Sequence, residues 1–319
     1  MRSLLVFPAA FLLATFAPAA LYRAPVPPNR PMVYADPVPL DADRPERTRL
    51  GRLRYLGGWQ LTSNDARFGG ISALHVRGGD VIAIADSGLA FGFRVPAGRS
   101  APLSITPVEC GTGRRKQDRD SEALAIVGDT AWAAFENANA ICRYRLPGWK
   151  GQARARPGTM RKWPAHSGAE AMVRLRDGRF LVFAEGPLRS GASRVLLFPG
   201  DPTRSAGAPV ILGYRPPAGF RITDAAELPD GRLLFLNRKL SLMEGVAAQL
   251  TIGRLPQRPS AGRVLGGELL AELRPPVVVD NMEGLSVTRE EGRTILWLAS
   301  DDNFIPLQRS LLLKFAWDG

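Results

Sequence analysis

Residues 120–136 read DSEALAIVGDTAWAAFE, which is two apolar runs joined by a Gly-Asp turn and closed by an acid. The same pattern of a small polar or acidic residue, then Ala or Gly, then an apolar run recurs five times, roughly every 50 residues. Gly-Asp and Asp-Gly pairs between such runs are typical of β-hairpins. Short strands in a repeat of about 40–50 residues indicate the blades of a β-propeller. The five copies begin at Ser72, Glu122, Glu170, Asp224 and Glu283.

The repeats predict an all-β fold, because helical periodicity is missing after Arg49 and each copy reads as four strands. The last copy supplies only three strands, whereas residues 52–61 form a strand without a partner near the start of the chain. We expect this N-terminal strand to complete the last blade, which closes the ring and removes two exposed sheet edges. The prediction is five four-stranded blades. A sixth, split or degenerate blade within residues 187–220 or 240–276 is the alternative.

Residues 1–20 have the pattern of a secretion signal: Arg2, an apolar run from Leu4 to Phe16, and a small-residue cleavage site at residues 17–19. The run is shorter than the ~20 residues of a membrane helix, so we expect cleavage and no stable membrane insertion, with an uncleaved anchor as the alternative. Residues 21–50 are Pro-rich and are interpreted as a linker, or as a strap on the folded domain. Residues 51–319 then form a propeller domain, periplasmic or secreted.

The composition narrows the classes of partner. Lys and Arg number 42 against 30 Asp and Glu, a formal net charge of +12, which suits small anionic or phosphorylated substrates. Without a basic block or an aromatic-interleaved basic stripe, nucleic acid is not an expected partner, and we expect a monomer. The two cysteines, Cys110 and Cys142, predict a disulfide between adjacent blades in an exported protein; two buried free thiols are the alternative.

The hairpins of the repeat bring its polar residues to one face of the ring. An antiparallel hairpin places the start of its first strand beside the end of its second, and these two positions are about 14 residues apart in the first four copies. The residues that begin the copies should lie nearest the axis, with Ser72 on the least negative side. An outer ring should contain the residues that end the second strands: Asp86, Glu136, Glu185, Asn237 and, in the fifth copy, Ser300 or Asp301.

The inner ring is the predicted metal site, made of Ser72, Glu122, Glu170, Asp224 and Glu283. Four carboxylates and a hydroxyl around one axis repel one another unless some are protonated or a cation neutralises them. Oxygen ligands without His or Cys favour a hard cation, and six to eight ligands suit Ca²⁺ better than Mg²⁺. The alternative is that these acids cap hairpins and accept hydrogen bonds from backbone amides, which requires no metal.

Several motifs occur in a fixed order along the chain. They are Asp120-Ser121-Glu122-Ala123-Leu124, Gly168-Ala169-Glu170-Ala171-Met172, Asp280-Asn281-Met282-Glu283-Gly284-Leu285-Ser286, Asp301-Asp302-Asn303-Phe304 and Leu311-Leu312-Leu313-Lys314-Phe315. This ordered set resembles the phytase-like family, also called esterase-like activity of phytase, over nearly all of residues 50–319. The resemblance implies an exported bacterial β-propeller that hydrolyses phosphate esters or carboxyl esters.

For a Ca²⁺-dependent hydrolase of this kind we expect Asp86, Glu136 and Glu185 to orient or deprotonate water, and His166 to act as an acid or base. Arginine suits bidentate contact with phosphate oxygens. The expected substrate-binding residues are Arg238, Lys239, Asn237, Arg115 and Asp301. His75, within an inner strand, is interpreted as a core residue. The alternative function is a noncatalytic propeller that binds an envelope glycan, peptide or protein, with the metal purely structural.

Overall fold

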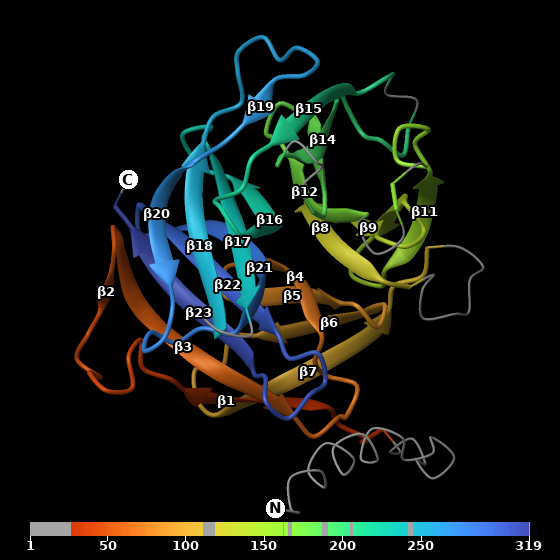
Figure 1. Ribbon diagram of the computed structural model, residues 1–319. Coiled ribbons are helices and arrows are strands. Elements are labelled where there is room, and N and C mark those ends of the chain that lie inside the picture. The colour runs from red at the N-terminus through yellow and green to blue at the C-terminus, as the bar shows by residue number, and fades with distance from the viewer. Residues whose placement is uncertain are drawn as a thin grey trace, which may run out of the picture.

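The strands are arranged around a central axis as the blades of a propeller (Figure 1). A computed structural model describes residues 27–110, 119–161, 163–164, 168–186, 191–204, 207–241 and 245–318. In this part of the chain the regular secondary structure is all-β, and no helix is long and apolar enough to cross a membrane. The residues expected to form a secretion signal lie outside the described ones.

The described residues form five blades, each with four antiparallel strands. Blade 1 consists of β4 (Ile71–Arg77), β5 (Asp80–Ala85), β6 (Leu89–Arg94) and β7 (Ser100–Pro107). Blade 2 consists of β8 (Ser121–Val127), β9 (Thr130–Phe135), β10 (Ala140–Arg145) and β11 (Lys150–Ala155). Blade 3 consists of β12 (Ala169–Arg174), β13 (Phe180–Ala184), β14 (Ser193–Phe198) and β15 (Val210–Tyr214), with the short β19 (Val264–Leu265) added parallel to β15.

Blades 4 and 5 complete the ring. Blade 4 consists of β16 (Arg221–Glu227), β17 (Leu233–Ser241), β18 (Gly245–Gly253) and β20 (Glu268–Leu273). Blade 5 consists of β21 (Asn281–Glu290), β22 (Arg293–Asp301), β23 (Ser310–Trp317) and β3 (Leu53–Ser63). The first strands of the blades, β4, β8, β12, β16 and β21, contact one another in a closed circle around the axis. The prediction of an all-β propeller with five blades is confirmed, without a sixth among the described residues.

An N-terminal strand closes the ring, as the sequence predicts. β3 pairs antiparallel with β23, so the last blade takes its outermost strand from the start of the domain. β1 (Met32–Pro37) then pairs with both β3 and β7, and joins the outer edges of blades 5 and 1. β2 (Arg49–Leu50) pairs with β3. The described part of the Pro-rich segment therefore lies on the fold as a strap, and the structured chain starts earlier than the expected boundary at Gly51.

Five hydrophobic clusters fill the spaces between neighbouring blades, one at each blade interface. Residues that follow the polar anchor of an inner strand are small, because the inner strands crowd together at the axis. Ala73, Ala123 and Ala171 are buried at this position. A Cβ on Gly284 would lie 2.9 Å from the Cβ of Leu74, so blade 5 tolerates only glycine there without adjustment. Burial of these faces supplies the main driving force for ring assembly.

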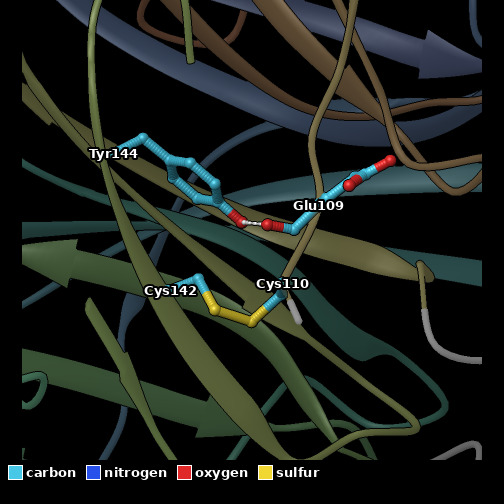
Figure 2. Close-up of a disulfide and its surroundings, with 4 residues drawn as sticks. All are labelled: Glu109, Cys110, Cys142 and Tyr144. Atoms are coloured by element: carbon cyan, nitrogen blue, oxygen red, sulfur yellow. Dashed lines mark hydrogen bonds between the residues drawn. A yellow bond between two sulfur atoms is a disulfide. The ribbon is translucent and has the colours of Figure 1, made fainter. Parts of the chain in front are cut away.

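Blades 1 and 2 are also joined covalently. Cys110 follows β7, Cys142 lies in β10, and the two form the expected disulfide. Figure 2 shows this bond beside Tyr144, whose hydroxyl donates a hydrogen bond to the carbonyl oxygen of Glu109 at 3.2 Å. The covalent bond and the hydrogen bond both hold the segment after β7 against the third strand of blade 2.

Candidate metal and hydrolytic site

A β-bulge at the same place in every inner strand builds the inner ring. The pairing between first and second strands slips by one residue in each blade, and this leaves one residue of the inner strand outside the ladder. Bulges commonly re-aim a side chain beside a functional site. The bulged residues are Ser72, Glu122, Glu170, Thr223 and Glu283.

The fourth member of this ring differs from the sequence prediction by one residue. Thr223 occupies the bulge of β16, whereas Asp224 takes the position that Ala73, Ala123 and Ala171 occupy in other blades. The Asp224 carboxylate accepts hydrogen bonds from the backbone N–H groups of Leu285, at 2.7 Å, and Ala225, at 2.8 Å. Burial raises its pKa well above the usual value, although these two amides act against that rise. Asp224 thus caps backbone amides between blades 4 and 5.

The two hydroxyl members of the inner ring connect neighbouring blades. Ser72 lies within hydrogen-bond distance of the carbonyl oxygen of Ser121, the residue before Glu122 in the next inner strand. Thr223 donates in the same way to the carbonyl oxygen of Met282, at 3.0 Å. Each hydroxyl has a single proton, and in these contacts it donates that proton across the interface between two blades. The carboxylates of the inner ring therefore come from blades 2, 3 and 5.

The outer ring also shifts in blade 4. Asp86, Glu136 and Glu185 directly follow their second strands, as expected. The backbone N–H of each donates a hydrogen bond to the carbonyl oxygen of the residue two positions before the bulge. In blade 4 the equivalent residue is Arg238, which pairs with Arg221, and in blade 5 it is Asp301, which pairs with Asn281. The outer ring therefore contains four carboxylates and one cation, Arg238.

Asn237 lies one residue earlier and is fully buried inside blade 4. Its side chain accepts a hydrogen bond from the Tyr214 hydroxyl at 2.7 Å, and its amide lies 3.2 Å from the Thr251 hydroxyl. This position does not support the expected contact with substrate. The sequence pattern could not separate Asn237 from Arg238, because both are polar and the register depends on the bulge.

The carboxylates concentrate beside blade 2. Single carboxylate oxygens of Asp120, Glu122 and Glu136 lie within 4.8 Å of one another. Burial raises the pKa of Glu122 well above its usual value, and Glu170, Glu283 and Asp120 raise it further. Asp120 was not among the predicted site residues, although its signal is present two positions before Glu122, where alternate residues of a strand share a face. These donors are all oxygen atoms, as a hard cation prefers.

Arg238 lies on the opposite side of the site, between blades 4 and 5. Its Nη1 bonds to Glu283 and to the side-chain oxygen of Asn281. Burial raises the pKa of Glu283 to about 7, while Arg238 and Asn281 hold it lower. Burial, with Glu283 next, raises the pKa of Asp301 to about 8. The two residues thus hold protons near neutral pH in the metal-free site.

The remaining predicted residues are placed as follows. Glu185 forms an ion pair with Arg221 at 3.2 Å. Lys239 is half-buried and runs beside Gly219. Arg115 and His166 lie outside the described residues.

The charged residues at this end of the inner strands are called the acidic mouth below. It comprises Asp86, Asp120, Glu122, Glu136, Glu170, Glu185, Arg238, Glu283 and Asp301.

The chain is similar to one protein family in sequence and to several solved structures in fold. A profile of the phytase-like family, described as esterase-like activity of phytase, matches residues 66–304. No curated protein sequence matches significantly. Among solved structures, the RS223 β-xylosidase shares 14% identity, covers 82% of this chain and 94% of its own, and gives a TM-score of 0.48.

Two further structures are similar to the same degree. The major Malassezia sympodialis allergen Mala s 1 shares 8% identity, covers 77% of this chain and 92% of its own, with a TM-score of 0.47. An α-L-arabinofuranosidase from Clostridium thermocellum shares 12% identity, covers 72% of this chain and 82% of its own, also with a TM-score of 0.47. At these values the neighbours add nothing about activity. The family match spans most of the chain, including every inner-ring residue, and the protein therefore belongs to the phytase-like family.

Proposed function

We propose that this phytase-like propeller hydrolyses phosphate esters, or related esters, at the acidic mouth with bound Ca²⁺. The observation that carries the proposal is the clustering of Asp120, Glu122 and Glu136 within 4.8 Å, opposite the cationic Arg238. Such an arrangement supplies a cation site and an anion site across one opening. Hydrolysis of a phosphate ester needs both sites. In the transition state, negative charge increases on the oxygens that the metal and the guanidinium would contact.

The donors present fit a hard divalent cation. Buried carboxylates that raise one another's pKa are stabilised when a cation replaces the protons. Asp120, Glu122 and Glu136 would hold the ion, and Glu170 would add an oxygen from the neighbouring inner strand β12. When bound, the cation would polarise an ester oxygen and lower the pKa of a water molecule.

The described residues provide the other groups that hydrolysis requires. The hydrogen bonds that Arg238 donates to Asn281 and Glu283 both come from Nη1, and Nη2 and Nε are suited to hold an anionic ester oxygen. Asp301 carries a proton at neutral pH and can give it to the leaving oxygen. Asp86 and Glu185 lie in the same outer ring, where they can orient the attacking water. His166 and Arg115 stay candidates for acid–base work and substrate binding.

Export of the protein, with action as a monomer on a small anionic substrate, belongs to the same proposal. The disulfide between Cys110 and Cys142 supports an oxidising compartment, either the periplasm or the medium. Cleavage after the expected secretion signal is checked by the N-terminal sequence of the mature protein, and the monomer by light scattering.

The test combines an activity panel with melting curves. Aryl phosphates, nucleotides and aryl carboxyl esters are supplied with Ca²⁺ or with a chelator, to wild type, Glu122→Gln, Arg238→Gln and the remote control Arg258→Gln. We expect turnover that requires Ca²⁺, a loss of at least about 100-fold in Glu122→Gln, and an unchanged control.

Two results would contradict separate parts of the proposal. No turnover of any ester, with stabilisation by Ca²⁺ intact, would favour a noncatalytic module that binds an envelope partner. A melting temperature that is the same with Ca²⁺ and with chelator would reject the metal site.

A further inference from the structure

A second candidate site lies at the opposite ends of the inner strands, away from the acidic mouth. A cavity of about 370 Å³ opens there, lined by the C-terminal halves of all five inner strands and by the turns that follow β12 and β16. Its size falls in the range of about 300–1,000 Å³ that is typical of small-molecule sites. Polar groups at its wall include His75, Ser286 and Thr288. We call this opening the basic mouth, with Arg174, Arg176 and Arg289 at its rim.

An apolar layer separates the basic mouth from the acidic mouth. In every inner strand the residue two positions after the bulge is apolar and buried, between 1% and 8% exposed. These residues are Leu74, Leu124, Met172, Ala225 and Leu285, and all five line the cavity as its floor. A charged ligand in one mouth therefore has no polar route to the other, and the two openings act as separate sites.

The charges at this mouth are opposite in sign to those at the acidic mouth. Glu227 is the carboxylate among the described lining residues, and Arg176 engages it. The backbone N–H of Arg176 donates to Glu227 at 2.7 Å, and its Nε lies 3.4 Å from the same oxygen. The guanidinium of Arg176 also donates to the carbonyl oxygens of Leu228 and Pro229, which fixes it across the gap between blades 3 and 4.

Arg174 and Arg289 supply positive charge in excess of the one carboxylate, Glu227, of the described lining. Neither forms an ion pair with a described carboxylate; Arg174 adds to the effect of Arg179 in lowering the pKa of Asp177, in the turn after β12. Arg289 donates to the carbonyl oxygen of Gly292 at 3.0 Å, so its guanidinium keeps most of its N–H groups available. Burial lowers the pKa of His75 to about 4, and Arg77 lowers it further, so the imidazole is neutral and adds a donor or acceptor without charge. The mouth is thus an apolar floor under three guanidinium groups, with one carboxylate among the described lining residues.

We propose that the basic mouth binds a small organic anion, whose carboxylate or phosphate contacts Arg174 and Arg289 and whose apolar body rests on the floor of Met172 and Leu285. Guanidinium groups bind carboxylate and phosphate through paired hydrogen bonds. The floor contributes burial of apolar surface, which an inorganic anion lacks. This site is independent of hydrolysis at the acidic mouth, because the apolar layer divides the two.

The experiment measures binding of benzoate and phenyl phosphate by calorimetry, in chelator, beside benzyl alcohol and benzylamine. We expect one molecule of each anion to bind per chain, and no binding of the neutral or cationic analogue. Arg174→Ala/Arg289→Ala should weaken the anions by about tenfold or more, since each substitution removes a hydrogen bond to a charged group. Arg258→Ala/Arg263→Ala removes the same charge at exposed, remote positions and should bind as wild type does.

Methionine methyl NMR locates the site without reference to activity. The Met172 methyl resonance, assigned with Met172→Leu, should move on addition of benzoate, whereas that of Met160 in the core between blades 2 and 3 should not. Equal affinities in the two double variants, an unmoved Met172 signal, or no binding at millimolar anion would each overturn the proposal. Melting curves of both double variants check that they are folded.

Discussion

Replacing Arg238 with glutamine should destabilise the metal-free protein strongly at alkaline pH and weakly at acidic pH. Arg238 is the cation of the outer ring, and its side chain is 19% exposed while that of its partner Glu283 is 11% exposed. Removal of the guanidinium leaves Glu283 with only the amide of Asn281, bonded at 2.9 Å, among the described groups that hold its charge. A buried carboxylate that loses its cation must either stay ionised at a high cost or take up a proton.

The magnitude follows from burial and from proton uptake. Loss of one partner from a buried ion pair costs about 3–5 kcal/mol, and the residual exposure of this pair reduces that to about 2–3 kcal/mol. The pKa of Glu283 is already about 7 with Arg238 present, so it rises further without it. A carboxyl whose folded pKa lies above its unfolded value favours folding at low pH, and this contribution is lost as the pH rises through the folded pKa. One pKa unit corresponds to about 1.4 kcal/mol, so the cost grows above pH 7 and should be small at pH 6 and nearly complete at pH 9.

Melting curves in chelator test this at both pH values. A cost of about 2–3 kcal/mol corresponds to a fall of about 5–10 °C in the melting temperature at pH 9. Glu283→Gln combined with Arg238→Gln should recover most of that fall, because the unpaired charge is then absent. The matched control is Arg94→Gln in the exposed pair with Asp80, where the side chains are 69% and 68% exposed, and it should shift melting by no more than about 2 °C.

The reasoning would be refuted if Arg238→Gln melted like Arg94→Gln at pH 9. It would also be refuted if the fall were equal at pH 6 and pH 9, because proton uptake by Glu283 would then play no part. A double variant that melts lower than either single variant would show that the two side chains contribute through packing and not through their charges.

Three further predictions concern the disulfide, the rim and the pH. Cys110→Ser opens a loop with a sequence separation of 32 and should lower unfolding free energy by about 3–4 kcal/mol in urea titrations; no change would contradict a formed bond. Gly70→Ala places a Cβ 2.6 Å from Asp86 Oδ1 and should cost more than Gly78→Ala, which has a similar φ and open space, by about 1–3 kcal/mol. In chelator, wild type should melt higher at pH 6 than at pH 9, because burial raises the folded pKa of Asp301 to about 8, and the opposite trend would exclude protonated carboxyls.

The sequence predicted the number of blades because each repeat carries its own hairpin. Glycine turns and alternating apolar runs are local signals, and the pairing within a blade needs nothing further. Closure by the N-terminal strand also followed, since residues 52–61 lacked a local partner. β1 was missed because Pro37 and its neighbours read as a linker. Val33 and Ala35 nevertheless alternate as buried residues, and proline is tolerated at a strand end.

The bulge of blade 4 lies one residue before the predicted position, and the reason is not the one that hid β1. Asp224-Ala225 imitates the Glu-Ala of the other copies, so the sequence alone favours the wrong residue. The position of the bulge depends on how β16 packs between β12 and β21, which is a tertiary effect that local pattern does not encode. One residue of slip moves a strand's side chains to the other face. Here it exchanged the neutral Asn237 for Arg238 in the outer ring and so added one positive charge.

Because Arg238 and not Asn237 lies in the outer ring, the two sides of the acidic mouth differ in charge. Blade 2 contributes Glu122 and Glu136 to the two rings, with Asp120 beside them, whereas blade 4 contributes a hydroxyl, Thr223, and a cation, Arg238. The electrostatic potential must therefore become less negative from blade 2 to blade 4. A divalent cation would be most stable at the blade 2 side, and an anionic ester oxygen would be repelled least beside Arg238. In the proposed reaction, an ester bound between the two would have its orientation fixed beforehand, which lowers the entropy cost of hydrolysis.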